Sequence, residues 1–378
     1  MIASQTDIVN VRTAGISTEA DWADLMLSVI FGKGPSQDGF LRGRANTVSA
    51  FCRRHLISVT VVSALPNSTL PRETVATLTE AMSKRYEQQK VLHRQLATAI
   101  ADIQPALDQE GISWRLMKGP HLQQDYYGAL AREYFDLDIL VPKEQFVHAR
   151  SVLARLGWSA RKRGFIPLRL VRRFEHGLGM QRGESIIDLH WSLRVRPTYQ
   201  IDEGRVFASG KMSNWAEIEV PVLDPEYDLT LCLLSIAQGL ERERAVLRDA
   251  IDLYLILRAV DGTMSWHSFF REREREGTER ICVSLLAAAV SWLDQENRLA
   301  NLRSELGKMG CAYPSTEVNP LKNCIGLKNA KGAGRRWYLS MYRGGKGRYW
   351  LSTSMSVVLN QEFPYNLRRT SLFSRFKG

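Results

Sequence analysis

Cysteine is scarce in this 378-residue chain, and its few cysteines form no recognisable framework. No CxxC pair occurs, and the seven histidines never group with cysteines at the spacing of zinc ligands. A chain of this length can bury a core without disulfides. We therefore expect reduced thiols and a cytoplasmic protein. The five cysteines are Cys52, Cys232, Cys282, Cys311 and Cys324.

Long hydrophobic runs are also missing. The longest, LISVTVVSAL at 56–65, is too short to cross a bilayer and carries two serines and a threonine. The first residues, MIASQTDIVNVRTAG, lack a basic start followed by an apolar segment. We therefore expect no signal peptide and no membrane partner.

Several common catalytic motifs do not occur. The chain has no GxxxxGK followed by Ser or Thr, no HExxH and no GxSxG, and no GxGxxG follows an expected strand. These absences argue against P-loop nucleotide hydrolases, HExxH zinc proteases, α/β-hydrolases and dinucleotide-binding proteins.

The excess of basic over acidic residues is concentrated near the end of the chain. The net charge is +11, and from residue 316 onward there are twelve lysines and arginines but two glutamates. Aromatic residues alternate with these cations, as in GAGRRWYLSMYRGGKGRYW at 332–350. This composition suits a nucleic acid or another polyanion. A solvated extension that aids solubility is an equally weighted alternative.

The apolar pattern predicts helices and a few strands. From Glu73 to Gly111, apolar residues recur at three- and four-residue steps, which predicts one or two long helices. Strands are expected at 113–119 and 135–141, with a hairpin at 176–193 and a strand pair near 216–223. Further helices are expected at 18–32, from Pro120, and at 143–157, 225–240, 244–260, 265–276 and 278–296.

The segment FDLDILV at 135–141 places two carboxylates in an otherwise apolar strand. Asp136 and Asp138 alternate, so both side chains project from the same face of the strand. Two like charges near a core repel each other, and a divalent cation with a preference for oxygen ligands compensates them most simply. For an isolated pair we would favour the alternative, exposed aspartates that pair with Arg132 and another base.

A third carboxylate strengthens the metal interpretation. Asp188, in SIIDLHW, lies on the second strand of the expected hairpin. If that strand pairs beside FDLDILV, three aspartates converge on one patch. Such a patch can hold two Mg²⁺ ions, one that positions a triphosphate and one that activates an attacking hydroxyl.

These motifs together resemble a known family. LMKGPHLQQDYYGALAREYFDLDILV at 116–141 and IIDLHWSL at 186–193 are similar to an uncharacterised bacterial branch of the DNA polymerase β-like nucleotidyltransferase superfamily. The shared features are a Lys-Gly turn, Arg-x3-Asp-x-Asp and Asp-Leu-His-Trp, and the resemblance extends over about 70–260. It implies an α+β fold, in which a small mixed β-sheet is flanked by helices and followed by a mainly helical second half.

The residue patterns, the charge distribution and the resemblance together divide the chain into four expected parts. These are an N-terminal helical segment at 1–70, a nucleotidyltransferase catalytic domain at 71–222, a helical domain at 223–315 and a basic C-terminal extension at 316–378.

The resemblance also implies roles for individual acidic residues. Asp136 and Asp138 are expected to bind both metals and the β- and γ-phosphates of the nucleotide. Asp188 is expected to bind the catalytic metal and to act as the base for the acceptor. All three are therefore expected catalytic residues.

The expected nucleotide-binding residues are basic or lie in the turn. Lys118 and Gly119 form the turn at the phosphates, where backbone N–H groups and a cation stabilise anionic oxygens. Pro120 stands where this superfamily typically has serine and offers neither donor, so Lys118 is the expected cation. Arg132 either clamps a phosphate or holds the aspartates, with a structural ion pair as an equal alternative.

Three further residues are candidates for the acceptor side. His190 shares a strand face with Asp188 and can touch the metal or the acceptor, although a histidine satisfied by a nearby carboxylate is the favoured alternative. Asp249 and Asp252 are three residues apart on one helix face and can meet a cationic acceptor or the base. A solvated helix face is the favoured alternative for this pair.

The expected function is transfer of an NMP from a Mg²⁺-bound NTP, with ATP the expected donor, to an acceptor hydroxyl or phosphate. Two Mg²⁺ ions are expected, with Mn²⁺ as a substitute, and the acceptor is expected to be a small molecule or a peptide natural product. The alternatives are a non-catalytic nucleotide- or RNA-binding protein and a toxin-like transferase that acts on tRNA.

Overall fold

The computed structural model describes most of the chain between residues 18 and 322. The expected polyanion-binding extension at 316–378 lies outside the described residues, apart from Asn319, Leu321 and Lys322. The described residues are 18–32, 41–161, 176–193, 199–241, 247–311, 313–314, 319 and 321–322.

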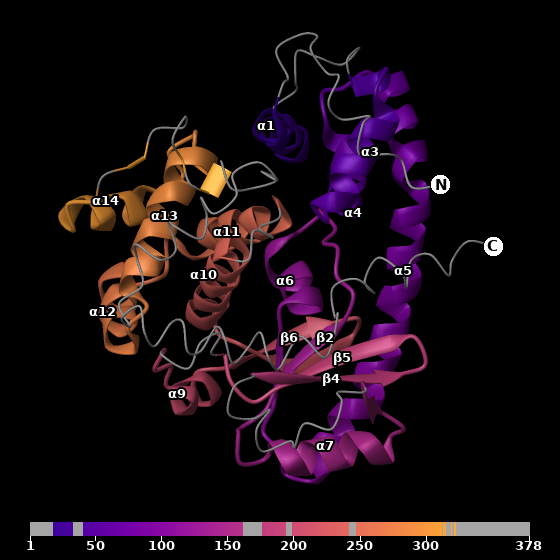
Figure 1. Cartoon of the computed structure of the whole chain (residues 1–378), viewed down its shortest axis with the longest axis vertical. Coiled ribbons are helices and arrows are strands. Elements are labelled where there is room, and N and C mark those ends of the chain that lie inside the picture. Colours follow the sequence, from indigo (N-terminus) through magenta and orange to yellow (C-terminus); the bar gives the residue numbers. More distant parts are fainter. Residues whose placement is uncertain are drawn as a thin grey trace.

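One long helix, α5 (Arg72–Gln109), links two hydrophobic cores and confirms the long amphipathic pattern. Leu78 and Met82, from its first half, belong to a core shared with other helices. Leu96 and Ile103, from its second half, pack in the core beneath the sheet. The helix therefore runs along one side of the whole molecule (Figure 1).

The strands form one mixed sheet in the order β3-β4-β5-β2-β1-β7-β6. The pairs β2–β5 and β1–β7 are parallel and the remaining pairs are antiparallel. This arrangement confirms the mixed sheet with flanking helices. The bounds are β1 Arg115–Met117, β2 Leu137–Leu140, β3 Ser159–Ala160, β4 Gly177–Arg182, β5 Ser185–His190, β6 Lys211–Trp215 and β7 Ile218–Val222.

The register of β2 against β5 determines where the site forms. Leu137 pairs with Ile187 and Ile139 with Leu189, and these four side chains are fully buried in the core that α5 and α7 (Phe146–Arg155) cover. The residues between them therefore face the other side of the sheet, toward α6 (Gly119–Tyr126). Figure 1 shows α7 and α6 on opposite sides of the sheet.

Two hairpin turns differ in how well the sequence marks them. Gly183 has a φ of +58° and makes the turn between β4 and β5, as expected from Arg182-Gly183-Glu184. Ala216 and Glu217 make the turn between β6 and β7 with φ values of +51° and +67°. The expected strand pair near 216–223 is present, but its first strand begins earlier, at Lys211. Its turn was not located from the sequence because no glycine marks it.

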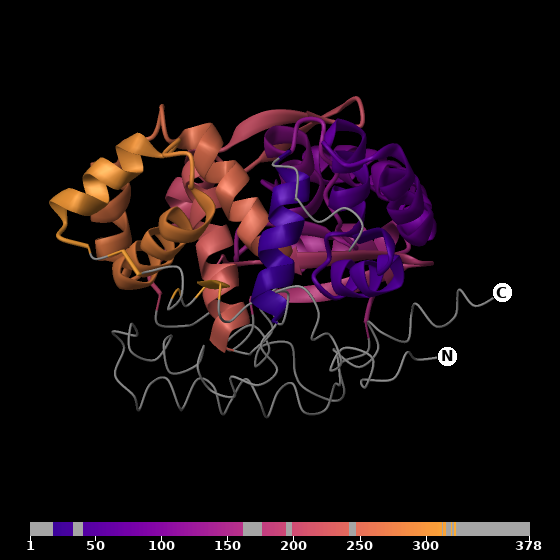
Figure 2. The ribbon, with the colours of Figure 1, turned by 90° about the horizontal axis from the view of Figure 1, so that it is seen from above.

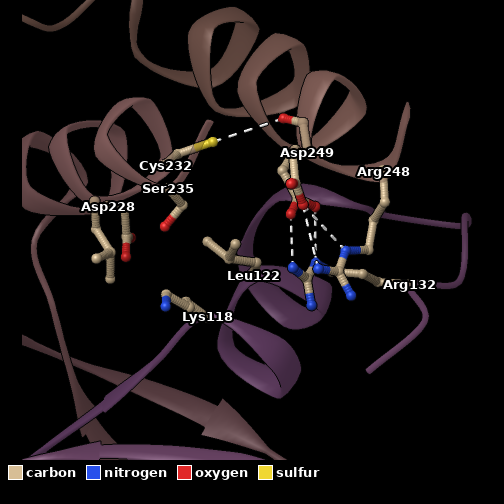
Figure 3. A pocket seen from close by; sticks show the side chains of 10 residues that line it. Lys118, Leu122, Arg132, Asp228, Cys232, Ser235, Arg248 and Asp249 are labelled. Atoms are coloured by element: carbon tan, nitrogen blue, oxygen red, sulfur yellow. Dashed lines mark hydrogen bonds and ion pairs between the residues drawn. The ribbon is translucent and has the colours of Figure 1, made fainter. Parts of the chain in front are cut away.

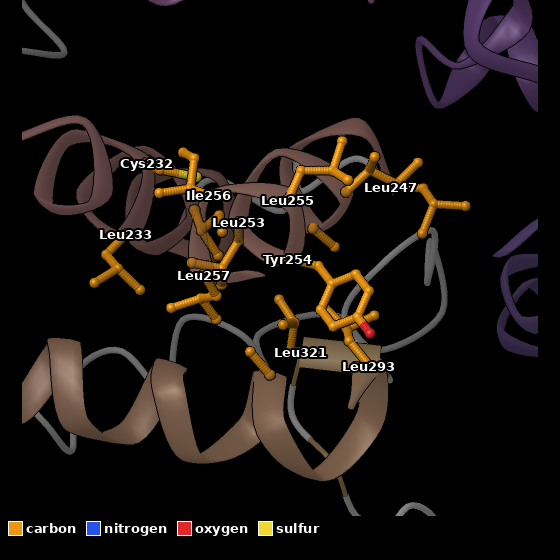
Figure 4. Packing of buried hydrophobic residues seen from close by; sticks show 14 of the residues in the cluster. Cys232, Leu233, Leu247, Leu253, Tyr254, Leu255, Ile256, Leu257, Leu293 and Leu321 are labelled. Carbon is orange, nitrogen blue, oxygen red and sulfur yellow. The ribbon is translucent and has the colours of Figure 1, made fainter. Parts of the chain in front are cut away.

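The second half is helical, as expected. Helices α10 and α11 pack through leucines and isoleucines, and Tyr254, Leu293 and Leu321 belong to the same buried cluster (Figure 4). The bounds are α9 Glu203–Ala208, α10 Pro225–Glu241, α11 Leu247–Val260, α12 Trp266–Glu276, α13 Glu279–Leu293 and α14 Ala300–Lys308.

The N-terminal helices pack against this helical half. Phe31 contacts Tyr254 edge to face with ring centroids 5.2 Å apart, and Trp292 Nε1 donates to Asp24 Oδ1 at 2.8 Å. Figure 2 shows the first helix beside the C-terminal helices. The boundary expected at residue 70 stays a prediction, although both sides of it contribute to one core. The bounds are α1 Glu19–Ile30, α3 Ala45–Arg54 and α4 Ser58–Ala64.

The described part of the chain also shows the state of the cysteines and the character of the helices. The cysteines that the structure describes, Cys52, Cys232, Cys282 and Cys311, are all free. Over the same part of the chain, every helix is too short or too polar to span a bilayer.

A buried charge cluster joins α10 and α12. Arg273 is fully buried and bonds Glu226 at 3.2 Å and Glu276 at 2.8 Å. Burial raises the pKa of Glu276 from 4.5 to about 7, although the charge of Arg273 opposes the shift. A carboxyl with a raised pKa stabilises the fold fully below pH 4.5, and this contribution is lost as the pH rises through 7.

Glu276→Gln is therefore expected to make the stability less dependent on pH. Relative to the variant, the wild-type free energy of unfolding should fall by up to roughly 3 kcal/mol between pH 4.5 and 8. Urea unfolding at several pH values measures this difference. Glu274→Gln, on the exposed face of the same helix, is the control and should leave the pH dependence unchanged. Parallel pH curves for wild type and Glu276→Gln would contradict the expectation.

Candidate active site

Asp138, Asp188 and His190 converge on the face of the sheet opposite the α5 core. One ligand atom from each lies within 4.8 Å of the others, and they make up the candidate metal-binding group found among the described residues. His190 Nε2 lies 2.8 Å from Asp138 Oδ1. Asp138 and His190 are 8% and 6% exposed, and Asp188 is half-buried. The set offers two carboxylates and one imidazole, a donor set that fits a divalent cation.

Strand pairing brings this group together. Asp138 and Asp188 are direct partners in the parallel register of β2 and β5, which confirms that the strand of Asp188 pairs beside FDLDILV. His190 follows two residues later on the same face. Because the two carboxylates come from adjacent strands, their separation is set by the backbone hydrogen bonds of the sheet.

A glycine on β4 leaves room for the ring of His190. Gly177 pairs with His190 and Gly179 with Asp188 across the β4–β5 ladder. A Cβ atom at Gly177 would lie 2.8 Å from His190 Nδ1, closer than real Cβ contacts allow. The ring of His176 stacks on His190, with centroids 5.3 Å apart. The orientation of His190 therefore depends on the absence of a side chain at residue 177.

Asp136 lies just outside the strand. It occupies a bend one residue before β2 and is half-buried, and it does not belong to the 4.8 Å group. The structure thus brings two of the three expected aspartates together with His190. A role for Asp136 as a metal ligand stays a prediction.

The Lys-Gly turn lies directly beside the carboxylates. Lys118 and Gly119 have φ values of +50° and +22°, and Pro120 stands in the first turn of α6. A positive φ at a non-glycine residue costs on the order of 1–3 kcal/mol and is often found at functional sites. Lys118 Nζ lies 4.0 Å from Asp138 Oδ1, and a Cβ at Gly119 would lie 3.4 Å from the carbonyl oxygen of Asp136.

Two small pockets adjoin Lys118. Both are lined by Lys118, Leu231 and Ser235, so they meet along a shared wall between α6 and α10. The smaller one has a volume of 20 Å³ and is also lined by Met117, His176, His190, Ser192, Leu193 and Gln238. The larger one has a volume of 110 Å³ and is also lined by Leu122, Arg132, Asp228, Cys232, Arg248, Asp249 and Asp252 (Figure 3).

Arg132 makes a buried, bidentate ion pair with Asp252. Its Nε and Nη2 atoms donate to the two carboxylate oxygens at 2.7 and 2.6 Å, and the Tyr127 hydroxyl adds a bond of 2.6 Å. Burial alone would raise the pKa of Asp252, but the charge and hydrogen bonds of Arg132 hold it below its usual value. Arg132 thus makes the structural ion pair, and both oxygens of Asp252 are engaged instead of facing solvent.

Asp249 lies beside that pair at the pocket wall. Burial raises its pKa, while Arg248, which donates to Oδ1 at 3.2 Å, opposes the shift. Figure 3 shows Arg248 and Arg132 side by side facing the carboxylates of α11. Arg248 also donates to the carbonyl of Glu133 at 3.3 Å. These contacts join the segment before β2 to the helical half.

Some residues at the site were not identified from the sequence. Asp228, Ser235 and Arg248 line the larger pocket. Each is a polar residue in a helix, and its type alone indicates only a solvated or capping role. His121 immediately follows the Lys-Gly-Pro turn and reaches Asp228 at 2.7 Å. Its position after the turn is the one local signal that was available.

Comparison with known proteins identifies a family. The model of a family described as uncharacterised nucleotidyltransferase matches residues 44–294. The chain is similar to a crystal structure of ANT(2″)-Ia in complex with adenylyl-2″-tobramycin, at 13% identity, 57% coverage of this chain, 99% of that chain and a TM-score of 0.29. It is also similar to a solution structure of antibiotic-resistance factor ANT(2″)-Ia, at 15% identity, 58% coverage of this chain, 96% of that chain and a TM-score of 0.28. No curated protein matches the sequence.

Gly177→Ala is expected to weaken metal binding, because the added methyl displaces His190. Disturbing the groups that orient metal ligands typically lowers affinity roughly 10- to 100-fold. Titration with Mn²⁺, followed by electron paramagnetic resonance of the free ion, measures the change. Gly262→Ala is the matched control, since a Cβ there meets no atom within 4 Å. Equal Mn²⁺ affinity in both variants would show that the position of His190 does not matter.

Asp252→Asn is expected to destabilise the fold by about 3–5 kcal/mol, because it leaves the Arg132 charge buried without its partner. Guanidinium unfolding gives the value. Asp102→Asn removes an exposed partner of Arg182 and should cost less than about 1 kcal/mol. The double variant Arg132→Met with Asp252→Leu should lose less stability than the sum of the losses in Arg132→Met and Asp252→Leu made singly. Additive losses would mean that the two residues do not act as a pair.

Proposed function

Because the chain belongs to the uncharacterised nucleotidyltransferase family whose model it matches over 44–294, we propose that it transfers an NMP from a metal-bound NTP to an acceptor. The acceptor contributes a hydroxyl or phosphate oxygen, and pyrophosphate is released. The observation that carries this proposal is the parallel register of Asp138 with Asp188, which places both carboxylates with His190 beside the Lys118 turn.

Asp138, Asp188 and His190 would hold the divalent cation. When bound, Mg²⁺ or Mn²⁺ neutralises phosphate charge and lowers the pKa of an attacking hydroxyl. The carboxylates suit Mg²⁺, and the imidazole of His190 also suits Mn²⁺. With Asp136 as a further ligand, the same face of the sheet would hold the two ions that the motif implies.

The protein residues divide the remaining work. Lys118 and the first backbone N–H groups of α6 would bind the triphosphate, since a helix N-terminus favours anions. Asp188 would accept the proton of the acceptor as its oxygen attacks the α-phosphorus. The bond from the α-phosphorus to the bridging oxygen breaks, and the electron pair leaves with pyrophosphate. Before the cation binds, His190 Nε2 would hold Asp138 in place through its 2.8 Å contact.

The helical half would complete the site. The Arg132–Asp252 pair and the bond from Arg248 to Glu133 tie α11 to the segment that precedes β2. Substrates bound near Lys118 would therefore contact both halves at once. Such orientation between fixed walls is a large part of catalysis in group transfer. We expect ATP as the donor and a small molecule or peptide natural product as the acceptor.

Replacement of either central aspartate tests the proposal. Purified protein is incubated with each α-labelled NTP, Mg²⁺ or Mn²⁺, and separate pools of hydroxylated metabolites, peptides and tRNA. Asp138→Asn and Asp188→Asn should each lower label transfer and pyrophosphate release at least about 100-fold, since each removes a metal ligand and Asp188→Asn also removes the base.

Asp102→Asn serves again as the control, because this exposed aspartate pairs with Arg182 and belongs neither to the metal-binding group nor to the lining of the two pockets. Transfer that persists in the Asp138 and Asp188 variants would refute the assigned roles. NTP binding without transfer to any pool would favour a non-catalytic nucleotide-binding protein, and label on tRNA would identify the acceptor class.

A further inference from the structure

Asp228, in the wall of the larger pocket, has one buried carboxylate oxygen without a partner among the described residues. The residue is 2% exposed and lines the pocket beside Lys118. Its Oδ1 atom is buried and has no hydrogen-bond partner among the residues that the structure describes. An unpaired buried acceptor is costly, so such an atom in a pocket wall indicates a missing donor.

The other oxygen of Asp228 is firmly held. Oδ2 lies 2.7 Å from His121 Nε2 and accepts a bond of 2.7 Å from the Tyr126 hydroxyl. Burial, together with the charge of Asp228, raises the pKa of Tyr126, so that this hydroxyl remains a donor. His121 is itself fully buried, and its Nδ1 atom lies 3.4 Å from Asp125. Asp228 therefore has one fixed orientation, with Oδ1 left for a ligand.

The volumes of the two pockets decide which one can hold more than a single water molecule. A cavity needs a volume of about 10–15 Å³ to hold one water. The 20 Å³ pocket beside His190 therefore holds about one water, whereas the 110 Å³ pocket holds a group the size of a sugar ring. Both pockets adjoin Lys118. A sugar attached to phosphates at the Lys-Gly turn therefore fits only the larger one.

The lining of the larger pocket favours a neutral ligand with hydroxyl groups. Its arginines are already paired, Arg132 with Asp252 and Arg248 with Asp249. The carboxylate of Asp228 repels phosphate but accepts hydrogen bonds from hydroxyls. Near it, the half-buried Ser235 adds a hydroxyl, and Leu122, Leu231 and Cys232 add apolar surface for ring carbons.

We propose that the larger pocket binds the ribose of the NTP, and that Asp228 Oδ1 accepts a hydrogen bond from its 2′- or 3′-hydroxyl. His121 and Tyr126 are positioning residues for this contact. The proposal rests on the proposed function, in which the Lys118 turn binds the triphosphate. It makes the protein selective for ribonucleotides over nucleotides that lack the bonded hydroxyl.

Calorimetric titration of the full chain with ATP, 2′-deoxy-ATP and 3′-deoxy-ATP in the presence of Mg²⁺ tests the contact. A hydrogen bond to a charged group is typically worth tenfold or more in affinity, so wild type should bind at least one deoxy analogue roughly tenfold more weakly than ATP. Asp228→Asn replaces the acceptor by a donor. It should weaken ATP about tenfold and leave that deoxy analogue unchanged.

Inorganic tripolyphosphate, which has no sugar, is the control ligand and should bind wild type and Asp228→Asn equally. Equal affinity of wild type for all three nucleotides would overturn the proposal without any variant. An equal loss for all three nucleotides in Asp228→Asn would also overturn it, because Asp228 would then support the fold and not the ribose. If wild type binds neither ATP nor tripolyphosphate, the proposed function itself fails and this proposal with it.

Discussion

Electrostatic repulsion between Asp138 and Asp188 is the constraint around which the site is organised. Parallel pairing of β2 with β5 forces the two carboxylates side by side, and hydrogen bonds of the sheet prevent them from separating. The groups around them reduce the cost: His190 contacts Asp138 directly and Lys118 lies 4.0 Å away. A bound cation would compensate both charges at once.

The rest of the molecule supports this arrangement from two sides. The core beneath the sheet buries the residues that alternate with the aspartates, so the register cannot slip by one residue without exposing them. Across the pocket, the Arg132–Asp252 pair joins the segment before β2 to α11. The long helix α5 contributes to both cores and connects the sheet to the helical half. The two walls of the pocket are thus held by separate interactions.

Much of the fold was predictable because it depends on local patterns. Period-3.6 spacing marked α5 and the helices α10 to α13, and alternation of apolar residues marked β2 and β5. Features with weak local signals were missed. Strand β3 has two residues, α9 has six, and the β6–β7 turn uses Ala216 and Glu217 where glycine or asparagine is usual.

The sequence by itself determined that Asp136 shares a strand face with Asp138, and Asp188 with His190, because spacing along a strand decides which side chains point the same way. Only the tertiary structure decided their partners. It paired Arg132 with Asp252 across 120 residues and left Asp136 outside the group with His190. It also placed Asp228 in the pocket through His121. Such contacts join distant segments, and no local pattern encodes which distant residue fills the space beside a given side chain.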